Sequence, residues 1–198
     1  MLNMKPLTAF VAMIIALVVV APAAFAQTKV IVIDQAQIER DSQAGQSLRN
    51  ALATINTQMQ SEVAPGEQAY QAQEAAFQGK VANMTQEAMQ ADPGIQTEFR
   101  ALQTKAAEVS QAREVRAAEM RMTQRKAAQA YAEALRPVVL EVMAEENAQV
   151  VLDKASVLMS DDAIDVTTKI ISKLDAATPT ISVTRERLPQ QPAANAGQ

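Results

Sequence analysis

Two short apolar runs lie far apart in the chain, and a long stretch of regularly spaced apolar and polar residues separates them. The first, at 30–33, contains only β-branched residues between Lys29 and Asp34, which predicts a strand buried on both faces. The second, AQVVLD at 148–153, is followed by VLM at 157–159. We expect the segments at 148–153 and 157–159 to form a hairpin-like pair of strands that joins the first strand. The residues expected in this small sheet are Val30, Ile31, Val32, Ile33, Val150, Val151, Leu152, Val157 and Leu158.

The stretch between these runs has the apolar spacing of two long helices. From residue 42 to about residue 90, apolar residues recur at steps of three and four and then at sevens, as in a heptad seam. The sequence ADPG at 91–94 interrupts the pattern, because Asp-Pro-Gly favours a turn and proline cannot continue the preceding helix. A second periodic segment extends from residue 95 to about 147. Two helices joined by so short a turn are expected to lie antiparallel, forming a coiled-coil hairpin arm over 45–146.

The expected seam of this arm is rich in Ala and Met and poor in Leu. Small side chains bury little apolar area, so we expect the arm to be flexible toward its tip. Pro65-Gly66 and Pro137 lie within the two helices, and each proline is expected to kink its helix. Alternatively, Pro65-Gly66 forms a true loop, and the arm is then a three-helix bundle.

The segment after the second apolar run predicts a closing helix and a tail. Residues 160–175 have an amphipathic pattern with Ser160 or Asp161 as the N-cap. From residue 176 to 198 the chain is rich in Pro, Gln and Ala without an apolar face, which predicts disorder. The small body, expected from 27–44 and 147–175, buries too little surface to stand alone and leaves strand edges open. We therefore predict a mainly α fold with a small β body that oligomerisation completes.

Residues 1–26 have the features of a secretory signal peptide. Lys5 precedes an apolar core at 7–21, and Ala-Phe-Ala at 24–26 matches a cleavage site. A retained membrane anchor is the alternative, but the apolar stretch is short for a span of about 20 residues. We expect an exported mature chain that starts at Gln27 and has no stable membrane insertion. Because the sequence contains no Cys, neither disulfides nor a lipidated cysteine are expected.

Composition argues against catalysis. The 198 residues include no His, no Cys and only five scattered Gly, so His-based triads, Cys/His metal sites and glycine-rich phosphate loops are excluded. The acid pairs Asp161-Asp162 and Glu145-Glu146 are poor catalytic dyads, because adjacent side chains on a helix point apart. We expect no enzyme activity and no cofactor. Export, the net charge of −4 and the small aromatic content also argue against nucleic acid binding.

Charge is distributed unevenly along the chain. Residues 100–126 carry seven basic and three acidic groups, whereas 133–165 carry two basic and eight acidic ones. The basic run could present a cationic stripe. The interpretation that we favour is an ordinary solvated helix face, with Glu114 and Glu119 as ion-pair partners. The basic residues concerned are Arg113, Arg116, Arg121, Arg125 and Lys126.

The two ends of this arrangement resemble one family. KVIVIDQAQI at 29–38 is similar to the N-terminal strand of the Skp (OmpH-like) periplasmic chaperones for outer membrane proteins, and AQVVLDKASVLMSDDAIDVTTKIISKL at 148–174 to their strand pair and closing helix. The middle resembles the family in length and composition. The resemblance implies a small sheet completed by trimerisation, with three helical arms around a cavity. In this cavity the family holds unfolded outer membrane proteins without ATP.

The resemblance also implies that side chains on the arm contact the client. The candidates besides the basic run are Tyr70, Phe77, Met84, Phe99, Met120 and Met122. Methionine suits an adaptable apolar surface, although each Met could instead fill the seam. Strongly basic family members attract acidic clients and lipopolysaccharide, and the acidic net charge of this chain argues against lipopolysaccharide as a partner. The alternative function is an adaptor coiled coil of the cell envelope that binds a single folded partner or peptidoglycan.

Overall fold

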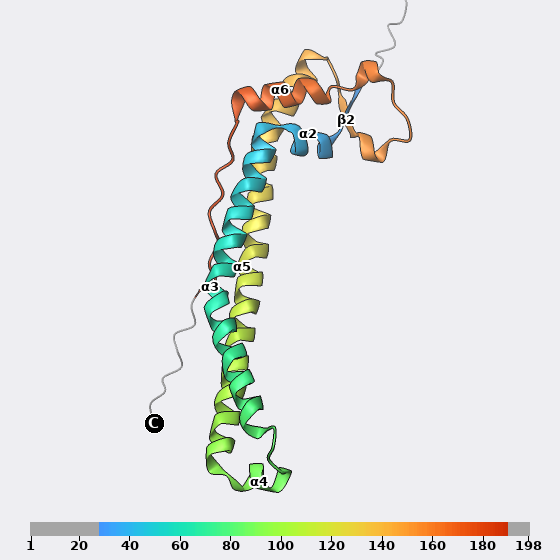
Figure 1. Ribbon diagram of the computed structural model, residues 1–198. Helices are drawn as coiled ribbons and strands as arrows, with labels where there is room; N and C mark the ends of the chain where they lie inside the picture. Colours follow the sequence, from blue (N-terminus) through green and yellow to red (C-terminus); the bar gives the residue numbers. More distant parts are fainter. Residues whose placement is uncertain (1–27, 190–198) are drawn as a thin grey trace, which may run out of the picture.

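The computed structural model describes residues 28–189, in which a long two-helix arm extends from a small body (Figure 1). The predicted signal peptide therefore lies outside the described residues. The elements in chain order are β1 (Val30–Ile33), α2 (Gln35–Asp41), α3 (Gln43–Val81), α4 (Gln86–Ala91), α5 (Pro93–Glu145), β2 (Val150–Asp153), the short 3₁₀ helices η2 (Lys154–Ser156) and η3 (Asp162–Ile164), and α6 (Thr167–Ala177). The chain is mostly helical with a small sheet, as predicted.

The sheet joins the two predicted apolar runs that are most distant in sequence. Strands β1 and β2 are parallel, with Val30 opposite Val150 and Ile33 opposite Asp153. A parallel pair needs a long crossover connection, and the whole arm supplies it. A further bridge places Asp165 beside Val32, and the Val166 N–H donates to the Val32 carbonyl at 3.0 Å.

The prediction of a third strand at 157–159 is wrong. The Asp153 carboxylate accepts a hydrogen bond from the Ala155 N–H at 3.3 Å and so starts η2 immediately after β2. This turn leads the chain away from the sheet before a second strand can pair. Val157 and Leu158 therefore lie outside the sheet, and Leu158 is 97% exposed.

The core of the body brings together residues from both ends of the described chain. It lies between β1, α2, the start of α3, the end of α5 and α6, and its fully or almost fully buried residues include Ile31, Ile38, Val142, Ile170 and Leu174. The linker Ser42 is buried, and its hydroxyl accepts from the Gly45 N–H at 3.1 Å to cap α3. A side chain at position 45 would clash with the backbone carbonyl of Glu39, so α2 and α3 can meet this closely only at glycine.

Helices α3 and α5 lie side by side along the arm (Figure 1). Of the predicted seam residues of α3, Leu48, Ile55, Met59 and Val63 are buried and Leu52 is partly buried, but no residue of this helix beyond Val63 is buried. The predicted continuation of the seam at steps of seven, through Tyr70, Phe77 and Met84, is therefore wrong, since all three are only half-buried. The half of the arm nearer the tip is therefore held by few buried contacts. Helix α3 continues through Pro65, so the three-helix alternative is wrong. Helix α5 likewise continues through Pro137.

The tip of the arm lies earlier in the sequence than predicted. Helix α3 ends at Val81 instead of near residue 90, and the short helix α4 follows, capped by the Thr85 hydroxyl. The Asp92 carboxylate accepts from the Gly94 N–H at 2.7 Å, and Pro93 is the first residue of α5. Proline is well suited to this position because its missing N–H would have no helical partner there. ADPG thus begins the returning helix, and the chain reverses over 82–92.

Two predictions for the C-terminal region also need correction. Asp161 caps η3 through the Ala163 N–H at 2.9 Å, and α6 begins only at Thr167. Residues 178–189, predicted to belong to a disordered tail, are instead extended along the arm (Figure 1), with Ile181 only 6% exposed. The packing that orders them comes from distant helices, which a local composition cannot reveal. The prediction for 190–198 lies outside the described residues.

Candidate functional site

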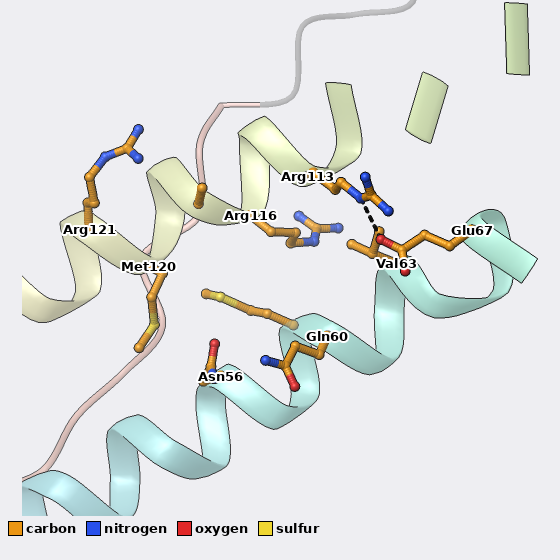
Figure 2. Close-up of a pocket in the computed structure, with 10 residues that line it drawn as sticks. Asn56, Gln60, Val63, Glu67, Arg113, Arg116, Met120 and Arg121 are labelled. Atoms are coloured by element: carbon orange, nitrogen blue, oxygen red, sulfur yellow. Dashed lines mark hydrogen bonds and ion pairs between the residues drawn. The ribbon is translucent and has the colours of Figure 1, made fainter. Parts of the chain in front are cut away.

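A groove of about 440 Å³ opens between α3 and α5 near the middle of the arm. The buried Met59 and Val63 of α3 and the half-buried Met120 of α5 are its apolar lining, and Figure 2 shows Met120 directed toward the space between the helices. Polar side chains surround this surface: Asn56, Gln60, Glu67, Arg113, Arg116 and Arg121. The groove is thus lined by methionine side chains and bordered by charged ones. Methionine is flexible and can adapt to varied apolar side chains.

The basic run does not form one cationic stripe. Arg113 pairs with Glu67 of α3, as Figure 2 shows, and Arg116 lies 2.9 Å from Glu62 and 3.0 Å from Glu119. Arg121 is exposed at the rim of the groove. Arg125 is exposed as well, and Lys126 pairs with Glu186 at 2.6 Å. Nearby carboxylates therefore balance much of the positive charge on this part of α5.

Glu119 is the important residue that the sequence interpretation missed. We predicted a solvated ion-pair partner, yet Glu119 is only 3% exposed. Burial raises the pKa of its carboxyl, but hydrogen bonds from Arg185 and the Leu188 N–H outweigh this and lower the pKa overall. Counting back from Tyr131 in steps of four reaches Ala127, Thr123 and Glu119, all of them buried. The helical period thus contained the signal, but a carboxylate on the seam face was not recognised as part of the seam.

The predicted aromatic contacts lie elsewhere on the arm. The Phe77 and Phe99 rings pair near the tip with centroids 5.9 Å apart, and Phe99 remains exposed. Tyr70 is half-buried, and its hydroxyl lies 3.2 Å from Glu74. Met84 at the tip and Met122 on α5 are also half-buried. The structure therefore brings Met120, Arg113, Arg116 and Arg121 together at the groove and leaves the other candidates outside it.

A second candidate surface is the outer part of the small sheet. Val150 and Leu152 are 37% and 41% exposed, although Val32, which lies opposite Leu152 in the register, is buried. Within residues 28–189, β2 has β1 as its only strand neighbour. A cavity of about 370 Å³ beside β2 is lined by Val151, Leu135, Val139 and the exposed Leu140. An open strand edge next to apolar side chains is a typical surface for pairing with another chain.

The body also contains a carboxylate whose titration should be measurable. Burial alone would raise the pKa of Asp165, but hydrogen bonds from Lys154 and from the hydroxyl and backbone of Thr167 lower it to about 2. The Thr167 hydroxyl in turn accepts from the Asp34 N–H at 2.9 Å, so this network connects the end of β1 to the start of α6.

Because the pKa of Asp165 is lower in the folded chain than its ordinary 3.8, the stabilisation is complete above that value and is lost as the pH falls toward 2. We expect this group to remove about 2 kcal/mol from the free energy of unfolding over that range. Urea unfolding at several pH values should therefore show a shallower acid loss in Asp165→Asn than in the wild type. Parallel pH curves for the two proteins would contradict the assignment.

Within the part of the chain that the structure describes, no helix is long and apolar enough to cross a membrane, and no group of acidic residues could hold a metal ion. A long helical arm with an adaptable groove, carried on a small body with an open strand edge, is the architecture of a binding protein. The family model described as outer membrane protein (OmpH-like) matches residues 29–174. The chain therefore belongs to the OmpH-like family, and the resemblance seen at the two ends of its sequence is confirmed.

A solved structure agrees with this membership. The chain is similar to a candidate outer membrane chaperone (OmpH-like) from Caulobacter crescentus, with 25% sequence identity and a TM-score of 0.69. The similarity covers 84% of this chain and 95% of the other. No curated protein matches the chain. The family supports a chaperone role.

Proposed function

We propose that the mature chain is an ATP-independent periplasmic holdase, which binds unfolded outer membrane proteins and prevents their aggregation during transit. The groove between α3 and α5 carries this proposal, because the half-buried Met120 lies there beside the buried Met59 and Val63 and offers apolar surface within an arm that otherwise has a narrow seam. Methionine side chains change shape at low energetic cost and so suit clients of varied sequence. Membership of the OmpH-like family supports the same role.

The loose packing near the tip fits this function. Beyond Val63, α3 has no buried residue, so the outer half of the arm can bend or separate with little loss of buried apolar area. Such an arm can close around clients of different size. Binding and release then depend on the competition between client folding and contacts with the arm, which needs no nucleotide.

We also propose a homotrimer in which the body of each chain completes the sheet of the others. The open edge of β2 and the exposed Val150 and Leu152 support this assembly, since natural proteins rarely leave such an edge uncovered. Lipopolysaccharide is not included as a partner, because carboxylates already pair with Arg113 and Arg116.

The test is light scattering of purified residues 27–198, alone and with a urea-unfolded outer membrane protein. We expect the mass of three chains, then the mass of three chains plus one client, and suppression of client aggregation. Replacing Met120 by Gln should weaken client binding severalfold, because it places a polar amide at the groove. Met122→Gln is the matched control on the same helix and outside the groove. A monomer or dimer that ignores the client would contradict the proposal and favour the adaptor alternative.

A further inference from the structure

Residues 178–189, here called the C-terminal strap, lie extended along the arm (Figure 1) and make hydrogen bonds to both of its helices. The strap follows α6 and begins beyond residue 174, where the match to the OmpH-like family model ends. Ile181 is buried, and Val183 packs against the core of the body.

Three backbone N–H groups of the strap donate to side chains of the arm. The Ile181 N–H donates to the Ser47 hydroxyl of α3 at 3.3 Å. The Glu186 N–H donates to Thr123 Oγ1 at 3.0 Å, and the Leu188 N–H donates to Glu119 Oε1 at 3.1 Å. Backbone groups are common to every polypeptide, so these three acceptors do not by themselves select a sequence.

One side chain of the strap supplies the specific contact. The Arg185 guanidinium donates to both carboxylate oxygens of Glu62 on α3, at 2.6 and 3.0 Å, and to Glu119 Oε2 on α5, at 2.6 and 3.1 Å. Hydrogen bonding by Glu62 is the largest cause of a raised pKa at Arg185, so the guanidinium stays charged. A buried carboxylate such as Glu119 is costly without a cation. This part of the arm is therefore complementary to a basic side chain on an extended backbone.

The surface under the strap is continuous with the groove. Arg116 lines the groove and also pairs with Glu62 and Glu119, the two residues that hold Arg185. The apolar side chains of an extended segment that replaced the strap would therefore be near Met120.

We propose that the arm surface formed by Ser47, Glu62, Glu119 and Thr123 is a binding site for an extended polypeptide segment with an arginine or lysine, and that the strap is its intramolecular ligand. The proposal rests on the holdase function and names one site for the client. A tethered ligand acts at an effective concentration of order millimolar, so a client must displace the strap to bind here. The strap thereby excludes weak ligands and yields to an unfolded chain that also occupies the groove.

Hydrogen exchange of the intact mature protein tests this displacement. Deuterium uptake is measured in the fragment covering 178–189, with and without a urea-unfolded outer membrane protein, and light scattering of the same samples reports whether a complex forms. We expect the client to speed uptake by the Ile181, Glu186 and Leu188 amides about tenfold or more. Uptake around the buried Ile170 should stay unchanged.

A matched pair of full-length variants supplies a second measurement. Arg185→Ala removes the anchor of the strap and should tighten client binding about tenfold, because each charged hydrogen bond to the strap is lost. Arg187→Ala removes the same charge from an exposed position two residues away and should leave client affinity within about twofold.

The two measurements separate the possible failures. A complex that forms while strap uptake stays slow would overturn the proposed site and leave the holdase function intact. Equal client affinity of Arg185→Ala and the wild type would do the same, because the strap would then not compete. The absence of any complex would overturn the holdase function and this site with it.

Discussion

Replacing Val150 and Leu152 together by glutamate should break the proposed trimer into single chains. Both side chains are exposed on β2 of the isolated chain, beside a strand edge that has no partner among the described residues. If another chain covers this surface, the variant must bury two unpaired carboxylates, each of which costs several kcal/mol. Light scattering should then give about a third of the wild-type mass, and circular dichroism should show the helical arm retained.

The control for this result adds the same two charges elsewhere. Gln124→Glu with Ala128→Glu places them on an exposed part of α5, so the trimer should persist. An unchanged mass for the variant at 150 and 152 would show that β2 lies outside the interface. Assembly would then need another surface, such as the exposed Leu158 and Met159.

Replacing Ile170 by alanine should cause a large loss of stability. Ile170 is 0% exposed and packs in the core that joins β1, α2, α5 and α6. The change removes buried apolar atoms and leaves a cavity, which costs about 2–5 kcal/mol of the free energy of unfolding. Urea unfolding followed by circular dichroism, at one fixed protein concentration because assembly contributes to stability, measures the loss.

The adjacent Ile171 is the matched control. The residue type and helix are the same, but Ile171 is only partly buried at the edge of the core. Ile171→Ala should therefore cost less than half as much as Ile170→Ala. Helix propensity favours alanine equally at both positions, so similar losses for the two variants would contradict the difference in burial between Ile170 and Ile171.

The two regions of the molecule serve different physical needs. The body concentrates its buried residues in a few short elements, with Ile38, Val142, Ile170 and Leu174 all at zero exposure. The arm buries residues only intermittently, and α3 buries none beyond Val63. A well-packed body can hold an assembly together, whereas a weakly packed arm can change shape around a client without unfolding the rest of the chain.

Sequence periodicity was informative wherever the local pattern decides the structure. Apolar residues at steps of three and four predicted the buried face of α3 from Leu48 to Val63. The β-branched run at 30–33 predicted β1, and its pairing with the run at 150–153 is confirmed. These features depend on side-chain spacing, which the sequence contains directly.

Local patterns misled where two signals compete. The run at 157–159 resembles a strand, but the Asp153 cap turns the chain first. ADPG resembles a turn, yet Asp92 and Pro93 are also suited to begin a helix, and they begin α5. In both places a capping carboxylate decided the outcome, because it satisfies backbone N–H groups that would otherwise lack partners.

By itself, the amino-acid sequence determined the long helices, the first strand and its partner, and the family of the protein. Only the tertiary structure decided that Glu119 is buried, that Arg185 pairs with it and that the strap is ordered. Their order depends on contacts across 66 residues between Arg185 and Glu119 and across 123 between Arg185 and Glu62. A prediction of disorder from a composition poor in apolar residues takes account only of neighbours in sequence. The strap is ordered because two distant helices bring a buried carboxylate to its arginine.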